Sequence, residues 1–486
     1  MFRLKEIVEA VDGRLLSADP QLRIGGVSID SRTIKHGQLF VAIKGSRFDG
    51  HDFIREAVKK GAKAIIGSVH SWQLTVDRKI PYIRVSDTRR ALGDLARFHR
   101  QRFNIPVIAI TGSNGKTTTK DMVAWILSSR IKVLKNEATQ NNDIGVPLTL
   151  LKLDISHDVV VLELGTNRFG EIAYLSGIAQ PNFGVIINIG PAHLENLRNL
   201  PGVYKEKTAL LKNLKLPRIA VLNADDPWLR KLRNNNRTIV ISYAIRTQSD
   251  FNAAQIRLTP PFVQGGVGAR KERAGFIEFS VNPASAYPKS APLRRKGKKN
   301  STSGQRIRLN TVGCYNIYNA LAAIAVSRML GCSYSSISRR LATFVFPSGR
   351  LKLVKSKGIT FIDDSYNANP VSFEEALDPL SKFSAQGRRI LVMGDMLELG
   401  RSAKMFHRRI GRRVARICDA FIGVGNLSKL TAEEAHKSGM DKGCIFTCEN
   451  SAQARDLLFR KLKPYRWDLI LVKGSRLMKM EEVFKK

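Results

Sequence analysis

Short runs of hydrophobic residues recur along the chain and alternate with longer segments of mixed polarity. In the first part, the runs at 38–43, 64–66 and 82–85 predict strands, and the stretch 52–60 predicts a helix. Glycine and aspartate residues between these runs are typical of turns. We therefore expect residues 1–97 to form a small α/β domain.

The middle of the chain carries a longer series of the same kind. Apolar runs typical of buried strands lie at 106–110, 159–164, 184–189 and 219–222, with helix-length segments between them. Strands that alternate with helices form right-handed βαβ units on a parallel sheet. We expect residues 98–311 to be such a domain.

The last part repeats the theme, with apolar runs at 360–363, 389–394, 420–425 and 469–472. This spacing predicts a second doubly wound, Rossmann-like sheet over residues 312–486. A chain of 486 residues has the length of roughly two to four domains. The pattern as a whole predicts an α/β protein of three domains.

The charge balance adds a constraint on partners. Lysine and arginine number 80 against 41 acidic residues, which leaves a net charge of +39. Such a surface attracts polyanions, including nucleic acids, acidic lipids and phosphorylated substrates. The segment 289–308 holds eight basic and no acidic residues. No aromatic side chain alternates with its charges, so we predict a mobile surface loop rather than a nucleic-acid site.

A second basic cluster has helical spacing. Five arginines recur on one side of a helical pattern, and apolar residues lie on the other, which predicts an amphipathic helix with a solvated basic face. The arginines are Arg408, Arg409, Arg412, Arg413 and Arg416, and the apolar residues are Phe406, Ile410, Val414 and Ile417.

The five cysteines include no C-x-x-C pair, which indicates reduced thiols and no structural zinc site. Glu6, Glu9 and Asp12 interrupt the apolar core that a signal peptide needs, and no run is long enough to span a bilayer. We expect a cytoplasmic protein without membrane insertion.

The sharpest local motif is TGSNGKTTT, from Thr111 to Thr119, between a predicted strand and a predicted helix. Glycines let backbone N–H groups approach phosphates, Lys116 can bridge the outer phosphates, and a threonine hydroxyl can hold magnesium. This predicts ATP or GTP binding. The alternative is a glycine-rich turn with an incidental lysine, because Gly112 and Gly115 are closer together than in the standard pattern.

Two further residues are candidate magnesium ligands. Glu163 ends one predicted strand and His193 follows another, and ligands of open α/β sheets gather at such strand ends. A helix cap accounts equally well for Glu163, and a structural histidine for His193. Their spacing leaves both alternatives open.

Ten segments in this order resemble the Mur ligases, and together they cover nearly the whole chain. They are SIDSRTIKHGQLFVAIKGSRFDGHDF from Ser28, TGSNGKTTTK from Thr111, TQNNDIGVPLTLL from Thr139, ELGTNRFGEI from Glu163, NIGPAHLE from Asn188, LNADDP from Leu222, YNIYNALAA from Tyr315, FIDDSYNANPVS from Phe361, GDMLELG from Gly394 and VKGSR from Val472.

The resemblance implies an ATP-dependent amide ligase of peptidoglycan synthesis. Such an enzyme would activate the tripeptide carboxylate of a UDP-linked muramic acid as an acyl phosphate and transfer it to the amine of D-alanyl-D-alanine. The implied partners are therefore small molecules, with no nucleic acid, and the implied state is a monomer. The third residue of the tripeptide, lysine or diaminopimelate, stays undetermined.

The resemblance also implies roles for individual residues in the nucleotide site. The phosphate cradle would be Gly112, Asn114, Gly115, Lys116, Thr117 and Thr118. Thr117, with Thr118 as a neighbour, would hold the first of two magnesium ions. Glu163 and His193 would serve the second. Lys207 would be carbamylated by carbon dioxide and would serve the second ion, although Lys205 is close to it in the sequence. Lys116, His193 and Lys207 are thus the implied catalytic residues.

The remaining implied contacts come from the outer parts of the chain. Asn319 would contact adenine, Arg350 the phosphates and Asp364 the ribose. The muramyl substrate would meet Ser31, Arg32, Thr139 and Asn141, and the dipeptide would meet Asn367, Asn369 and Ser372. These residues would come together only when the domains close.

Two alternatives remain. The first is another amide ligase of the same fold, which would extend a shorter muramyl peptide or add glutamate to folate. The second is a basic P-loop ATPase that binds nucleic acid.

Overall fold

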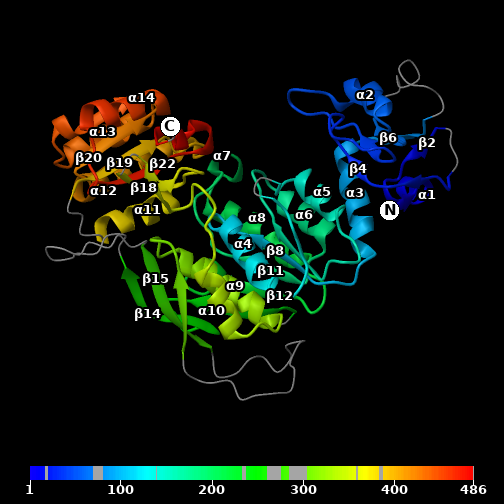
Figure 1. Ribbon diagram of the computed structural model, residues 1–486, viewed down its shortest axis with the longest axis horizontal. Helices are drawn as coiled ribbons and strands as arrows, with labels where there is room; N and C mark the ends of the chain where they lie inside the picture. Colours follow the sequence, from blue (N-terminus) through cyan, green and yellow to red (C-terminus); the bar gives the residue numbers. More distant parts are fainter. Residues whose placement is uncertain are drawn as a thin grey trace.

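The computed structural model describes residues 1–16, 20–68, 80–137, 140–232, 237–259, 275–283, 304–356, 359–382 and 387–484. Figure 1 shows three lobes that follow one another along the chain, an N-terminal lobe in blue, a central lobe in cyan and green, and a C-terminal lobe in yellow to red. The predicted α/β protein of three domains is confirmed. The described part of the chain has no helix that is long and apolar enough to cross a membrane.

The N-terminal lobe is a small sheet with helices. Its strands are β1 Phe2–Arg3, β2 Arg14–Leu15, β3 Arg23–Ile24, β4 Val27–Ser28, β5 Leu39–Val41, β6 Ala64–Gly67 and β7 Tyr82–Arg84, and its helices are α1 Leu4–Ala10 and α2 Ile54–Lys59. Helix α3 Thr88–Gln101 connects this lobe to the central lobe and contacts helices of both. The sheet order is β2-β7-β6-β5-β4, parallel except for β2. Because α3 runs through residue 97, the proposed domain boundary lies inside this helix.

The central lobe is built on a sheet with the order β16-β15-β14-β13-β12-β11-β8-β10-β9. Its strands are β8 Val107–Thr111, β9 Val133–Lys135, β10 Val159–Glu163, β11 Phe183–Ile186, β12 Ile219–Asn223, β13 Ile239–Ala244, β14 Phe251–Thr259, β15 Phe276–Pro283 and β16 Gln305–Leu309. Its helices are α4 Lys116–Leu127, α5 Gly145–Leu150, α6 Glu171–Ala179, α7 Leu194–Leu197, α8 Leu200–Lys212, α9 Asn316–Met329 and α10 Tyr334–Ala342. Strands β8, β10, β11 and β12 are fully buried, as continuous apolar runs predict.

Two expectations for this lobe are corrected. Strands β14, β15 and β16 pair antiparallel and extend the predicted parallel sheet. Of the basic segment 289–308, residues 289–303 lie outside the described part of the chain, but residues 305–308 belong to β16, so the predicted loop is wrong there.

The second proposed domain boundary also moves. Helix α9 contacts α4, β12 and β13, and α10 contacts β16, so both helices belong to the central lobe. Residues of both helices join the apolar core that covers this side of the central sheet. We therefore place the boundary proposed at 312 near residue 347.

The C-terminal lobe has the sheet order β17-β18-β22-β19-β20-β21, parallel except for β17. Its strands are β17 Lys352–Ser356, β18 Ile359–Asp364, β19 Arg389–Gly394, β20 Ala420–Val424, β21 Ile445–Cys448 and β22 Leu469–Lys473, and its helices are α11 Pro370–Lys382, α12 Ala403–Ile417, α13 Ser428–Lys437 and α14 Ser451–Asp456. The predicted second parallel sheet is confirmed apart from its antiparallel edge.

Helix α12 carries the predicted basic face, but this face is not simply solvated. Arg409 and Arg413 pair with Glu374 of α11 at 2.7 and 2.9 Å, and Arg412 pairs with Glu434 of α13 at 2.6 Å. The arginines therefore tie α12 to its neighbours within the lobe, because helices on both sides present carboxylates to it.

The fold brings strand ends from two sheets to one place. In the central lobe β8 ends at Thr111 and β10 at Glu163, and in the C-terminal lobe β18 ends at Asp364 and β22 at Lys473. Ligands in open α/β sheets bind beyond the carboxyl ends of the strands. The cleft between these two lobes is therefore where the fold predicts a ligand site.

Candidate active site

The loop between β8 and α4 is held rigidly by the segment that follows β11. Ser113 N donates to Asn188 O at 3.1 Å, Asn114 N to Asn188 Oδ1 at 2.9 Å, and Ser113 Oγ to Gly190 O at 2.8 Å. Gly115, the residue before α4, has a φ of +82°, and a Cβ there would overlap the Asn319 side chain. The loop therefore needs glycine at this position, and contacts within the protein hold its backbone.

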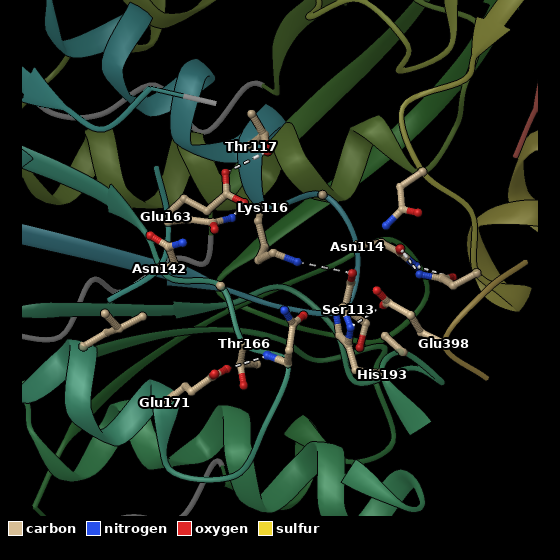
Figure 2. A pocket seen from close by; sticks show the side chains of 18 of the residues that line it. Ser113, Asn114, Lys116, Thr117, Asn142, Glu163, Thr166, Glu171, His193 and Glu398 are labelled. Carbon is tan, nitrogen blue, oxygen red and sulfur yellow. Dashed lines mark hydrogen bonds and ion pairs between the residues drawn. The ribbon is translucent and has the colours of Figure 1, made fainter. Parts of the chain in front are cut away.

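Lys116 begins α4 and folds back over this loop (Figure 2), where Nζ donates to Gly112 O at 2.9 Å. Burial lowers the pKa of Lys116, the Arg350 guanidinium lowers it further, and Glu163 opposes the shift. The ammonium thus lies in an environment that favours an added negative charge, which fits a phosphate group.

Glu163 lies at the centre of a network of oxygen and amide groups. Thr117 Oγ1 donates to its Oε2 at 2.7 Å, and Asn141 Nδ2 donates to its Oε1 at 2.9 Å. Arg350 Nη2, from the C-terminal lobe, donates to Thr117 Oγ1 at 2.9 Å. A carboxylate and a hydroxyl at this separation are the hard oxygen ligands that magnesium prefers.

Asn136, the residue that follows the neighbouring strand β9, fixes the backbone of Glu163. Glu163 N donates to Asn136 Oδ1 at 2.9 Å, and Asn136 Nδ2 donates to Glu163 O at 3.0 Å. The same amide group donates to Gln140 O at 2.7 Å, and Lys120 Nζ donates to Asn136 O at 2.7 Å. Asn136 is fully buried, and its side chain continues the pairing of β9 with β10 beyond the last residue of β9.

Lys207 lies on α8 with only 1% of its surface exposed. Its amine has no hydrogen-bond or ion-pair partner among the residues that the structure describes. Burial lowers its pKa well below the ordinary value, the nearby Lys116 ammonium adds to this, and Glu206 opposes it. Lys205, the alternative in the sequence, is exposed.

Contacts across the two lobes complete the site. The side-chain amides of Asn114 and Asn369 bond reciprocally at 2.6 and 3.3 Å, and His193 Nδ1 lies 2.7 Å from Glu398 Oε2. The two lobes are thus closed on each other. Within the C-terminal lobe, Lys473 Nζ lies 2.5 Å from Asp364 Oδ2 and donates to Asn367 O at 3.0 Å.

A cavity of about 880 Å³ lies between the lobes and extends along α3. Most predicted site residues line it, namely Asn114, Gly115, Lys116, Thr117, Thr118, Asn141, Glu163, His193, Arg350, Asp364, Asn367, Asn369 and Ser372. A volume of this size suits a nucleotide together with a second substrate.

Other predicted residues lie elsewhere. Asn319 is buried behind the loop, where it accepts from Thr119 Oγ1 at 3.3 Å, and does not line the cavity. Gly112 and Lys207 are likewise outside the lining. Ser31, which donates to Glu56 Oε2 at 2.9 Å, and Arg32, which pairs with Asp30, are in the N-terminal lobe away from the cavity. Thr139 lies outside the described residues.

Four residues of this region were not singled out from the sequence, namely Asn136, Glu375, Glu398 and Lys473. Glu398 lies in the GDMLELG segment and Lys473 in the VKGSR segment. The resemblance of these segments to the family marks both residues as candidates but does not indicate what either one does. Asn136 and Glu375 carry no comparable signal. Glu375 lines the cavity on α11, and burial raises its pKa to about 8.

A rigid phosphate loop at the carboxyl edge of a parallel sheet, closed by a second α/β lobe, defines a P-loop nucleotide-dependent enzyme. Three family descriptions match the chain: "Mur ligase family, catalytic domain" over residues 23–100, "Mur ligase middle domain" over 110–327 and "Mur ligase, glutamate ligase domain" over 349–476. The chain belongs to the Mur ligase family.

Individual relatives agree with this assignment. The UDP-N-acetylmuramoyl-tripeptide–D-alanyl-D-alanine ligases of Bacillus subtilis (strain 168) and Escherichia coli (strain K12) are 32% and 34% identical to the chain, and each comparison covers 99% of this chain and 97% of the relative. Among solved structures, MurF from Acinetobacter baumannii has a TM-score of 0.83 at 29% identity, with 99% of this chain and 97% of that chain covered. MurF from Thermotoga maritima in complex with ADP has a TM-score of 0.78 at 28% identity, covering 95% and 96%.

Proposed function

We propose that this chain is an ATP-dependent ligase that joins D-alanyl-D-alanine to UDP-N-acetylmuramoyl-tripeptide in peptidoglycan synthesis. The observation that carries the proposal is the cavity, whose one wall is the phosphate loop with Lys116 and whose other wall is the segment with Asn367 and Asn369. The curated relatives that match over nearly their whole length are named for this reaction. The resemblance to the ADP complex of the T. maritima protein supports ATP as the nucleotide.

The chemistry explains why these residues gather. A carboxylate is a poor electrophile and repels the triphosphate that it must attack, so positive charge has to surround the transferring phosphoryl group. Lys116 and Arg350, one from each lobe, would bind its oxygens. The acyl phosphate then reacts with the dipeptide amine, and the tetrahedral intermediate collapses to an amide and inorganic phosphate.

The residues present fit magnesium. The Thr117 hydroxyl and the Glu163 carboxylate, 2.7 Å apart, would hold one ion together with the nucleotide, and Glu163 and His193 would serve a second. Magnesium neutralises the charge that builds up on the phosphoryl group. Asn141 donates to the second oxygen of Glu163 at 2.9 Å and so keeps that carboxylate in place.

We also propose that Lys207 is carbamylated. A neutral amine adds to carbon dioxide to give an N-carboxylate and one proton, so the cation becomes an oxygen ligand. The burial of Lys207 supports this, because burial disfavours the charged amine and lowers its pKa well below the ordinary value. The exposed Lys205 has no such reason to lose its charge.

For the residues that would contact the ribose, the dipeptide, the muramyl substrate and adenine, we propose the roles that the resemblance implies. Asp364 would hold the ribose, Asn367, Asn369 and Ser372 the dipeptide, and Ser31, Arg32 and Asn141 the muramyl substrate. Asn319, buried behind the loop, would reach adenine only if the loop shifts. We also propose, as the resemblance implies, that a monomer is active, in the cytoplasm, where ATP is available.

The test is release of ADP and phosphate by the purified chain. We expect turnover only when UDP-muramyl-tripeptide and D-alanyl-D-alanine are both present, with the pentapeptide product seen by mass spectrometry. Turnover that depends on glutamate and a folate, or on RNA or DNA, would contradict the proposal. Substituting lysine for diaminopimelate in the tripeptide would then show which third residue the enzyme accepts.

A further inference from the structure

Glu398 and His193 face each other across the two lobes that close the cavity. His193 follows β11 in the central lobe, and Glu398 follows β19 in the C-terminal lobe. His193 Nδ1 lies 2.7 Å from Glu398 Oε2, both residues line the cavity, and Figure 2 shows their side chains next to each other at its edge. A backbone contact supports the pair, because Glu195 N donates to Glu398 O at 3.3 Å.

Both residues have an unfavourable backbone conformation. His193 has a φ of +53° and Glu398 a φ of +63°, in the left-handed region that residues other than glycine rarely adopt. Such conformations persist where the surroundings hold them, and they cluster at functional sites. Two such residues lie on opposite lobes and are joined by one side-chain contact. We take this to indicate that the pair is kept for its geometry and not for the stability that it adds.

The pair itself adds little to the stability of the fold. The Glu398 side chain is 54% exposed, and exposed ion pairs contribute little. By contrast, the contact fixes the orientation of the imidazole, because the ring turns the N–H of Nδ1 toward the carboxylate and leaves Nε2 for another partner. Nε2 has no partner among the residues that the structure describes, so it is available to a ligand of the cavity.

We propose that Glu398 is a positioning residue that orients His193 for catalysis, and that it does so only when the C-terminal lobe is closed on the central lobe. Carboxylates play this role beside histidines that bind metals or phosphates, by fixing the ring orientation and the tautomer. The closing motion that brings Arg350 to the phosphate loop then also sets the imidazole. The inference rests on the proposed ligase function for its activity readout.

The kinetic test compares three variants. We expect Glu398→Ala to lower kcat about 10- to 100-fold, the range found for partners of metal-binding histidines. Glu398→Gln keeps an acceptor oxygen and should recover part of this loss. Glu434→Ala is the matched control, because it removes a 2.6 Å ion pair within the same lobe, away from the cavity, and should retain the parent kcat.

The second readout is independent of turnover. In protein labelled with ¹⁵N-histidine at about pH 8.5, two units above the ordinary histidine pKa, His193 should be found as the Nδ1–H tautomer in the parent and lose this preference in Glu398→Ala. His193→Asn identifies the signal. An unchanged tautomer, or Glu398→Ala kinetics equal to those of Glu434→Ala, would overturn the proposal. Should the parent fail to use D-alanyl-D-alanine, the proposed function fails, and the tautomer alone decides whether Glu398 positions His193.

Discussion

The hydrogen bonds between Asn136 and Glu163 allow us to predict how much local stability is lost when Asn136 is replaced. Replacing Asn136 by alanine removes three side-chain hydrogen bonds, to Glu163 N, Glu163 O and Gln140 O, at 2.9, 3.0 and 2.7 Å. Each such bond contributes about 1 kcal/mol net, and the groups left behind are buried. We therefore expect Asn136→Ala to destabilise the local structure by about 3 kcal/mol, of which about 2 kcal/mol concern the end of β10 and about 1 kcal/mol the backbone at Gln140.

A functional loss should accompany this change, because the freed backbone no longer fixes the Glu163 carboxylate beside Thr117. We expect the magnesium concentration for half-maximal activity to rise about tenfold or more. Native-state hydrogen exchange of the β8 and β10 amides measures the first effect, and turnover across a magnesium titration measures the second.

Asn182 provides the matched control in the same sheet, because it lies at the amino ends of the strands, away from the site at their carboxyl ends. Its Oδ1 accepts from Val107 N at 3.0 Å, and its Nδ2 donates to Leu216 O at 2.6 Å. Asn182→Ala should cost about 2 kcal/mol and leave the magnesium requirement unchanged. If both variants shift the magnesium requirement equally, or if neither does, the reasoning that Asn136 acts through Glu163 is wrong.

Three further predictions concern charged groups of the site. Lys116→Ala should lower turnover about a thousandfold while circular dichroism and melting stay those of the parent, and near-normal activity would refute the phosphate-loop assignment. Lys207→Ala should be inactive and partly rescued by added acetate or formate, whereas Lys205→Ala should behave as the parent; a fully active Lys207→Ala would contradict the carbamate. Burial raises the pKa of Glu375 from 4.5 to about 8, against the opposing Lys473 ammonium, so the folded chain keeps a proton that the unfolded chain loses. Stability should therefore fall as the pH rises from about 4.5 to 8, and Glu375→Gln should remove this part of the fall; parallel melting curves of parent and variant against pH would contradict it.

The strands that position the site could be predicted from the sequence within about three residues at either end. Strand β8 at Val107–Thr111 and strand β19 at Arg389–Gly394 are buried on both faces, and such strands leave continuous apolar runs in the sequence. The antiparallel extension was missed because β14 and β16 carry exposed and polar residues along much of their length. Its pairing depends on neighbours that are distant in the sequence.

The missed site residues act through contacts that no local pattern encodes. Asn136 looks like a turn residue after a short strand, and only the register of β9 with β10 gives it two hydrogen bonds to Glu163. Glu398 is about 200 positions from His193 and meets it only because two sheets face each other across a cleft. Lys473 lies in the VKGSR motif, but its contact with Asp364 depends on the pairing of β18 with β22.

The charges of the site and the charge of the whole chain act at different ranges. Burial lowers the pKa of Lys116, and the neighbouring Arg350 guanidinium lowers it further. An anionic triphosphate placed among them relieves this repulsion, so part of its binding free energy comes from cations that the fold has already brought together. The field of the whole chain, whose net charge is +39, is screened over about 8 to 10 Å in physiological salt. It can therefore raise the rate at which an anionic nucleotide sugar meets the surface, whereas the few buried cations determine how tightly the phosphates are held.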